Sequence, residues 1–300
     1  MLLFAFEAFQ SMAASLQSLL QLPGGIFHVS RFENGEMHLD IQTRVTGERC
    51  RILGSIAPPD DRFLETLLLA HTLKKEKARE ITAILPYLAY TRHDKDKPGQ
   101  SMATGWAGSM FKASGCDRVI TVDLHSEAAR RLFPIPVISL SSAGVFASAI
   151  KEHDLSDAII VAPDEGAIPR CEDVRAAAGM PRAEVPYFEK HRTETGIVHG
   201  GPIGRLGPRA VIIDDILDTG TTLVSACERL AEVGVKETYV MVTHGLFTGE
   251  RWKRLWQVGV KQIFCTDSIP HCPSTEPAGR ERIVTLSIVS ELARYLHEAS

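Results

Sequence analysis

The 300-residue sequence lacks several features that mark other classes of protein. Its six cysteines include no Cys-x-x-Cys pair, which argues against a zinc ribbon and a disulfide scaffold. No uncharged apolar stretch reaches the roughly 18 residues that a membrane-spanning helix needs. Lysine and arginine number 33 against 37 acidic residues, so the basic excess typical of nucleic-acid binding is missing. These absences favour a reduced, cytoplasmic protein that binds neither nucleic acid nor membrane.

Two nucleotide-binding fingerprints are also missing, because neither G-x-x-x-x-G-K-[ST] nor G-x-G-x-x-G occurs. An ordinary P-loop kinase and a Rossmann oxidoreductase are therefore not supported. The apolar N-terminus, Met1–Phe6, has no basic residue before Arg31. We expect a short buried strand and an amphipathic helix over Phe9–Leu20 rather than a signal peptide.

Short apolar runs rich in valine and isoleucine alternate with segments of helical period, such as Arg62–Lys75, which predicts an α/β fold. Several runs lack polar alternation, so we expect strands buried on both faces in mostly parallel sheets. The predicted strands are Ile26–Val29, Cys50–Ile56, Ile81–Leu85, Val119–Val122, Ala158–Val161, Ala183–Phe188, Ala210–Ile213, Thr238–Val242 and Gln262–Cys265.

The same pattern, a strand that ends in acidic or polar residues and leads into a helix, occurs in both halves and predicts two similar domains. Pro134–Pro136 and the small residues of Ser139–Gly144 mark the boundary. We expect an N-terminal domain over residues 1–140 and a C-terminal domain over residues 141–284. The last helix, within residues 285–300, has no following strand, so packing on either domain stays open, including a return to the first.

The segment Ala210–Leu223 carries the most specific chemistry. A buried strand leads to Asp214 and Asp215, whose carboxylates can bind a sugar diol and, directly or through water, Mg²⁺. The turn that follows opens a helix, so its amides and hydroxyls suit a phosphate group at a positive helix N-terminus. Simple helix capping is the alternative, but it does not explain two adjacent acids. The turn consists of Asp218, Thr219, Gly220, Thr221 and Thr222.

Further polar segments follow or interrupt predicted strands. They are Phe32-Glu33-Asn34-Gly35-Glu36, the stretch from Pro86 to Lys95 with Arg92 and His93, Asp123-Leu124-His125, Ala162–Gly166 with Asp164, and Glu189-Lys190-His191-Arg192. The last segment precedes a glycine-rich stretch, Gly196–Gly207, which we expect to be a flexible loop. Simpler structural alternatives exist for each: a hairpin tip at Asn34-Gly35, solvated loops around Arg92 and Lys190, and a structural role for His125.

In order and spacing, these segments resemble the ribose-phosphate diphosphokinases, or phosphoribosyl diphosphate synthetases, from about Phe32 to Ile269. The resemblance implies a type I phosphoribosyltransferase-like fold. It also implies transfer of the β,γ-diphosphoryl group of ATP to O1 of ribose 5-phosphate, with Mg²⁺ as cofactor. The products are 5-phosphoribosyl 1-diphosphate and AMP. The family further implies a homodimer or higher homo-oligomer.

The resemblance also gives individual residues a role. ATP binding falls on Phe32, Asn34, Gly35, Glu36, Arg92 and His93. Ribose 5-phosphate binding falls on Arg192, Asp214, Asp215, Asp218, Thr219, Gly220, Thr221 and Thr222. The metal ligands are His125 and Asp164, and the catalytic residues are Lys190 and Arg192.

Three positions depart from the family's usual pattern. His93 stands where Gln is common, and Thr221 stands where Gly is usual. Ala167-Ile168 stands where a second glycine usually follows Gly166. The first departure bears on nucleotide specificity, and the other two bear on backbone approach to the sugar phosphate.

Two other functions stay open. A phosphoribosyltransferase would use the same sugar-phosphate turn but has no need of a Lys-x-Arg pair in this place. A non-catalytic regulatory relative would be a binding protein, which the retained Lys190, Arg192 and His125 argue against. His244 and Trp252 have no role in these functions and are expected to be core or interface residues.

Overall fold

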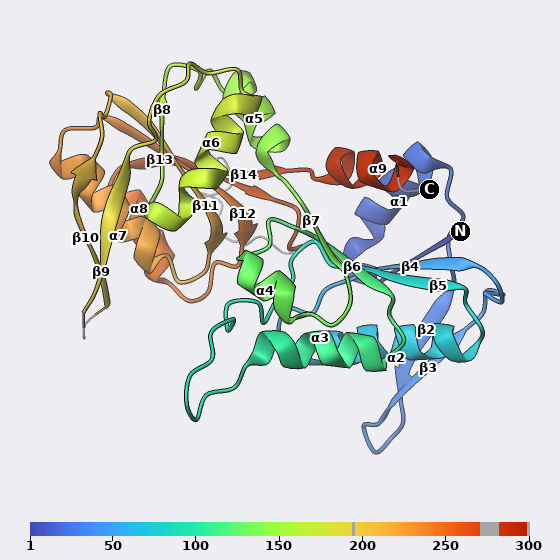
Figure 1. Ribbon diagram of the computed structural model, residues 1–300. Coiled ribbons are helices and arrows are strands. Elements are labelled where there is room, and N and C mark those ends of the chain that lie inside the picture. Colours follow the sequence, from blue (N-terminus) through green and yellow to red (C-terminus); the bar gives the residue numbers. More distant parts are fainter. Residues whose placement is uncertain (194–195, 271–281, 299–300) are drawn as a thin grey trace. The chain divides into compact units, whose positions relative to one another are not determined.

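The structure is a computed structural model that describes residues 1–193, 196–270 and 282–298. The chain divides into two compact units (Figure 1). Unit 1 comprises Met1–Leu140 together with Val289–Ser300, and unit 2 comprises Ser141–Ile288. No helix among the described residues is long and apolar enough to cross a bilayer.

Unit 1 contains a parallel sheet, an antiparallel hairpin and flanking helices. Its elements are β1 (Leu2–Ala5), η1 (Glu7–Phe9), α1 (Gln10–Leu20), β2 (Phe27–Arg31), β3 (Met37–Ile41), β4 (Arg49–Leu53), α2 (Asp61–Lys75), β5 (Glu80–Ile84), α3 (Ala103–Ala113), β6 (Arg118–Val122), α4 (Glu127–Leu132), β7 (Val137–Leu140) and α9 (Val289–Glu298). The sheet has the spatial order β1-β4-β5-β6-β7, and β2 pairs only with β3.

Unit 2 has the same kinds of element. They are α5 (Ala143–Glu152), β8 (Ile159–Val161), η2 (Glu165–Ala167), α6 (Ile168–Ala177), β9 (Tyr187–Thr193), β10 (Gly196–Ile203), β11 (Arg209–Leu217), α7 (Thr221–Glu232), β12 (Glu237–Gly245), η3 (Arg251–Lys253), α8 (Arg254–Gln257), β13 (Val260–Thr266) and β14 (Ile283–Leu286). The parallel sheet has the order β14-β13-β12-β11-β8, and β9 and β10 form a separate antiparallel ribbon (Figure 1).

The two units share one topology. In each sheet the strands follow one another in space in the order in which they occur along the chain. In each unit a hairpin is inserted between the first and second sheet strands: β2–β3 between β1 and β4, and β9–β10 between β8 and β11. The predicted fold class, two similar α/β domains with mostly parallel sheets, is confirmed.

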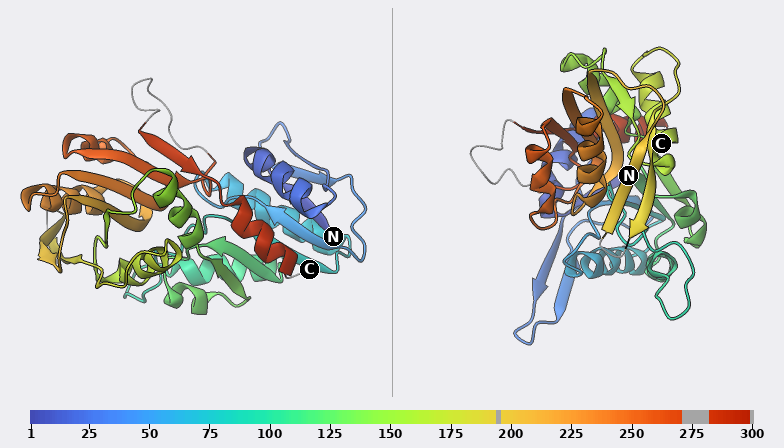
Figure 2. Two further views of the ribbon diagram at one scale, coloured as in Figure 1. Left: turned by 90° about the horizontal axis from the view of Figure 1, so that it is seen from above. Right: turned by 90° about the vertical axis from the view of Figure 1, so that its left-hand side faces the viewer.

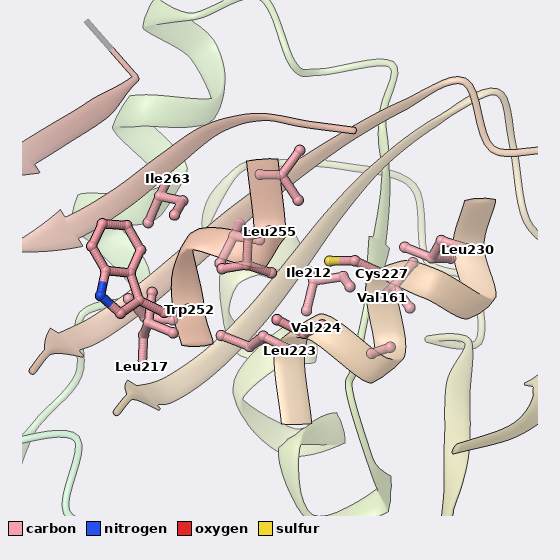
Figure 3. Packing of buried hydrophobic residues seen from close by; sticks show 14 of the residues in the cluster. Val161, Ile212, Leu217, Leu223, Val224, Cys227, Leu230, Trp252, Leu255 and Ile263 are labelled. Atoms are coloured by element: carbon pink, nitrogen blue, oxygen red, sulfur yellow. The ribbon is translucent and has the colours of Figure 1, made fainter. Parts of the chain in front are cut away.

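Both faces of the unit 2 sheet are buried. Along β11, Ala210 and Ile212 belong to one apolar cluster, and Val211 and Ile213 belong to the other. Figure 3 shows Ile212 packed among side chains of α7 and α8, including Val224 and Leu255. Burial on both faces explains why these strands are continuous apolar runs without polar alternation.

Several strands differ from the sequence prediction. The strand predicted over Ala183–Phe188 instead begins at Tyr187 and runs on to Thr193. Residues Gly196–Ile203, predicted to lie in a flexible loop, form β10 and pair with β9. Strands β7 and β14 were not predicted, because each has only four residues at the edge of its sheet and gives a weak apolar signal.

The C-terminal helix α9 packs in unit 1 next to α1, as Figure 2 shows. Its apolar stripe buries Leu292 and Leu296 completely or nearly so. The side chain of Arg51, itself buried in the sheet, donates a hydrogen bond of 3.5 Å to the carbonyl of Leu296. The C-terminal helix α9 therefore completes the core of unit 1, which is otherwise formed by residues 1–140.

Truncation of this contact should destabilise unit 1. Leu296 is only 1% exposed, so Leu296→Ala should leave a cavity and lower the free energy of unfolding by about 2 to 5 kcal/mol. Leu19 on α1 is 64% exposed, so Leu19→Ala is a matched control with a change within about 0.5 kcal/mol. Urea denaturation of both variants measures the difference, and equal stabilities would contradict the packing of α9.

Candidate active site

The acid pair lies near the carboxyl end of a central strand. Strand β11 pairs in parallel with β8 on one side and with β12 on the other. Its run of buried apolar residues from Ala210 to Ile213 is followed by Asp214 and Asp215, and the strand then continues to the buried Leu217, beyond the end that the sequence predicted at Ile213. In open α/β sheets the carboxyl ends of the strands are the edge where ligands bind. The topology therefore gives these two acids a position suited to ligand contact.

The two carboxylates share a cation. The Asp214 and Asp215 side chains are 17% and 10% exposed, and Oδ1 of Asp214 accepts a hydrogen bond of 2.9 Å from the Asp215 amide. Guanidinium nitrogens of Arg170 lie 4.0 Å from Asp214 Oδ1 and 4.0 Å from Asp215 Oδ2. Burial, and then the charge of Asp215, raise the pKa of Asp214 well above its ordinary value, while Arg170 opposes that shift.

A third carboxylate, Asp164, belongs to the same edge. It follows β8, the neighbour of β11, after Ala162 and Pro163. Its negative charge contributes to the raised pKa of Asp214. A side chain at Gly166 would bring a Cβ to 3.2 Å from Asp164 Oδ1, so glycine leaves room for this carboxylate. Asp164, Asp214 and Asp215 therefore gather where two neighbouring strands end.

The turn after β11 is held in a phosphate-compatible conformation. Gly220 has φ of 83°, in the left-handed region, and forms the N-cap of α7. The hydroxyls of Thr219 and Thr221 lie 3.1 Å apart, and the Asp218 carbonyl accepts a hydrogen bond of 3.1 Å from Thr248. The first amides of a helix have no intrahelical partner, so α7 presents N–H donors and a positive dipole end at this turn.

Trp252 supports the turn, a role that the sequence alone did not reveal. A Cβ on Gly220 would lie 2.7 Å from the Trp252 Cα, so the tryptophan backbone and the turn are in close approach. Trp252 is buried in the core (Figure 3), and its ring lies edge-on to the ring of Phe247 with the centroids 4.9 Å apart. Trp252 is a core residue, as expected, and only the fold brings it beneath the turn.

In unit 1, the segment of residues 32–36 forms the tip of the β2–β3 hairpin. Gly35 has φ of 88°, and its amide donates to the Phe32 carbonyl at 2.8 Å. The Asn34 side-chain oxygen accepts a hydrogen bond of 3.1 Å from the Glu36 amide. Phe32 is 56% exposed, which is unusual for a large aromatic side chain. The tip is therefore a well-defined turn that presents an aromatic face.

The loops after β5 and β6 contact each other in unit 1. Asp94 forms a hydrogen bond with the hydroxyl of Ser126, which also caps α4 by accepting from the Ala129 amide. The Thr104 hydroxyl donates to the His93 carbonyl at 2.8 Å. Arg92, His93 and His125 are exposed along these loops. The structure thus brings the predicted nucleotide loop next to the loop that carries His125.

Other predicted site residues are not brought together within one unit. His125 belongs to unit 1 and Asp164 to unit 2, so neither unit holds both predicted metal ligands. Among the described residues, no group of three or more His, Cys, Asp or Glu side chains could hold a metal ion. Lys190 and Arg192 lie within β9 rather than after a strand, and their side chains are outside the described part of the structure.

Comparison with known proteins gives the family. Residues 1–115 match the model of the N-terminal domain of ribose phosphate pyrophosphokinase, and residues 154–300 match the phosphoribosyl synthetase-associated domain. A ribose-phosphate pyrophosphokinase of Maricaulis maris is 31% identical over 292 residues, which cover 96% of this chain and 93% of that protein. The chain belongs to the ribose-phosphate pyrophosphokinase family.

Other members of the ribose-phosphate pyrophosphokinase family are similar to this chain over its whole length. The Vibrio cholerae protein is 31% identical, with coverage of 100% of this chain and 96% of that one. The crystal structure of the phosphoribosylpyrophosphate synthetase from Mycobacterium smegmatis superposes with a TM-score of 0.85 at 27% identity and covers 100% of this chain and 99% of its own. The chain is therefore similar to these proteins over nearly their whole length.

The turn should tolerate no side chain at Gly220. Gly220→Ala adds a Cβ at 2.7 Å from Trp252 Cα as well as left-handed strain, so the turn must shift. Gly234 is the matched control, because it has φ of 89° but no atom within 4 Å of the added Cβ. We expect Gly220→Ala to weaken binding of a sugar phosphate at least about tenfold, or about 1.4 kcal/mol, and Gly234→Ala to leave it unchanged. Calorimetry measures both, and equal affinities would contradict the role of the turn.

Proposed function

We propose that the two units divide the work of a ribose-phosphate diphosphokinase between them. The reaction transfers the β,γ-diphosphoryl group of ATP to O1 of ribose 5-phosphate and yields 5-phosphoribosyl 1-diphosphate and AMP. In this step the O1–Pβ bond forms and the bond between Pβ and the α,β-bridging oxygen breaks, while the O1 proton is released. The observation that carries the proposal is the acid pair above the phosphate-compatible turn, in a chain that matches the family from end to end.

Unit 2 would bind ribose 5-phosphate. The turn of residues 218–222 would receive the 5-phosphate, since helix amides and threonine hydroxyls are suitable donors to phosphate oxygens. Asp214 and Asp215 would accept hydrogen bonds from the ribose hydroxyls. The hydrogen bond from Asp215 to Asp214 and the neighbouring Arg170 support this role, because both keep the carboxylates in fixed positions. Thr221 in place of the family's usual glycine adds a further hydroxyl at the turn.

Unit 1 would bind ATP. The exposed ring of Phe32 at the hairpin tip can stack on the adenine base, and Asn34 and Glu36 beside it can contact the base edge. Arg92, on the loop after β5, can form a fork with phosphate oxygens. His93 next to it bears on the choice of nucleotide, because its imidazole offers other hydrogen-bond donors than the side-chain amide of the glutamine that is common at this position in the family.

We propose Mg²⁺ as the metal of this reaction, held by His125 and Asp164. The Asp164 carboxylate is a donor that suits Mg²⁺, and the exposed imidazole of His125 can add one nitrogen. Mg²⁺ usually keeps several waters and binds substrate phosphates, so a small set of protein ligands fits it. When bound, the cation would neutralise charge on the triphosphate; the protein's own groups orient the two substrates.

Lys190 and Arg192 would act on the transferring group. Strand β9 pairs with β10 in a ribbon that is bridged to the main sheet at Tyr187, before Lys190 and Arg192, which supports a segment able to bring cations to the diphosphoryl group. A charge that forms its best contacts in the transition state raises kcat more than it lowers KM. Arg192 would also contact ribose 5-phosphate.

We further propose a homodimer or larger homo-oligomer in the cytoplasm.

The test is product analysis with the purified chain. Incubation with ATP, Mg²⁺ and ribose 5-phosphate, followed by phosphorus NMR, should show AMP and 5-phosphoribosyl 1-diphosphate in equal amounts without any base acceptor. Consumption of 5-phosphoribosyl 1-diphosphate with a base, and no AMP from ATP, would instead identify a phosphoribosyltransferase. Binding of both substrates without turnover would identify a regulatory relative.

Removal of the proposed catalytic cation should reduce turnover rather than binding. Lys190→Ala should lower kcat by roughly 100-fold to 1000-fold with a small change in KM, as for the loss of one preorganised charge contact. Lys151, an exposed lysine on α5, offers a matched control, because Lys151→Ala removes the same charge away from the proposed site. Steady-state kinetics with both substrates measures this, and an unchanged kcat for Lys190→Ala would exclude the role.

A further inference from the structure

Arg170 was assigned no role from the sequence, yet it is the cation that the structure pairs with Asp214 and Asp215. It lies in the first turn of α6, the helix that follows β8 and η2. One terminal nitrogen faces Asp214 Oδ1 and the other faces Asp215 Oδ2, each at 4.0 Å. The Arg170 side chain is only 19% exposed, so its charge acts in a partly desolvated setting. A single planar guanidinium thus faces both carboxylates.

The charge balance of this edge depends on Arg170. The charges of Asp164 and Asp215 both act on Asp214, and Arg170 is the cation that the structure pairs with Asp214 and Asp215. Neighbouring carboxylates without a fixed counter-charge attract divalent cations, because oxygen-rich anionic sites are what hard cations prefer. A guanidinium at 4.0 Å from both carboxylates lowers that attraction and offsets the repulsion between them.

We propose that Arg170 is a positioning and specificity-determining residue. It prevents a divalent cation from binding to the acid pair, so that Asp214 and Asp215 stay available to the sugar hydroxyls. This inference rests on the proposed function of Asp214 and Asp215 in ribose binding. A cation bound directly between the two carboxylates would take the oxygens that the diol needs. Arg170 supplies the compensating charge without occupying the position of the sugar.

The shape of arginine is part of the argument. A guanidinium is planar and rigid, so two nitrogens can face two carboxylates at once. A lysine ammonium is a point charge on a flexible stem and would neutralise the pair without fixing both side chains. Arg170→Lys should therefore still exclude the divalent cation but restore ribose 5-phosphate binding only in part, whereas Arg170→Met should lose both effects.

The test measures Mn²⁺ binding to the full chain without substrates, by the loss of the free Mn²⁺ signal in electron paramagnetic resonance. Arg170→Met should bind Mn²⁺ at least about tenfold more tightly than the parent, which corresponds to about 1.4 kcal/mol. Adding Asp215→Asn to that variant should abolish the gain. Arg175, on the same helix, donates to the Pro181 carbonyl at 3.0 Å, so Arg175→Met is the matched control with unchanged Mn²⁺ affinity.

Kinetics provides the second readout. The KM for ribose 5-phosphate should rise about tenfold or more in Arg170→Met, with an intermediate value in Arg170→Lys and an unchanged KM for ATP. Unchanged Mn²⁺ affinity in Arg170→Met, or an unchanged KM for ribose 5-phosphate, would overturn the inference. Since Mn²⁺ binding needs no turnover, a parent protein without diphosphoryl transfer would refute the proposed function and still leave the charge effect of Arg170 measurable.

Discussion

The parallel pairing of β11 between β8 and β12 is the constraint on which the rest of unit 2 depends. Because both faces of this sheet are buried, β11 is a continuous apolar run from Ala210 to Ile213, and its acidic side chains come after that run, toward its carboxyl end. The strand therefore brings Asp214 and Asp215 to the edge at which β8 also delivers Asp164. The chain then turns through Gly220 into α7, so the carboxylates and the phosphate-compatible turn follow from one strand.

The repeated topology gives the two hairpins equivalent positions. The β2–β3 hairpin of unit 1 carries Phe32 at its tip, and the β9–β10 hairpin of unit 2 carries Lys190 and Arg192. Each is inserted between the first and second strands of its sheet and forms a separate two-stranded ribbon, which in unit 2 is bridged to the sheet edge between Tyr187 and Ala162. In both units the sheet provides a rigid edge, and the hairpin is a second segment that carries residues predicted to contact a substrate.

The sequence predicted most of the fold and, in unit 2, the succession of a buried strand, an acid pair and a turn that opens a helix; the binding roles of these residues stay predictions. Buried strands such as β11 are continuous apolar runs, and the acids and turn that follow them stand out by contrast. Four features lay beyond the sequence: the edge strands β7 and β14, the pairing of β9 with β10, the packing of Trp252 beneath Gly220, and the contact of Arg170 with the acid pair. All depend on residues distant in sequence or on short segments with weak patterns, which only tertiary packing determines.

The most direct test of this account is a crystal structure of the protein with ribose 5-phosphate bound. The account predicts the 5-phosphate at the turn of residues 218–222, with the ribose hydroxyls within hydrogen-bond distance of Asp214 and Asp215. Arg170 should remain paired with both carboxylates. A sugar phosphate bound with its phosphate away from this turn, or with its hydroxyls remote from the acid pair, would contradict it.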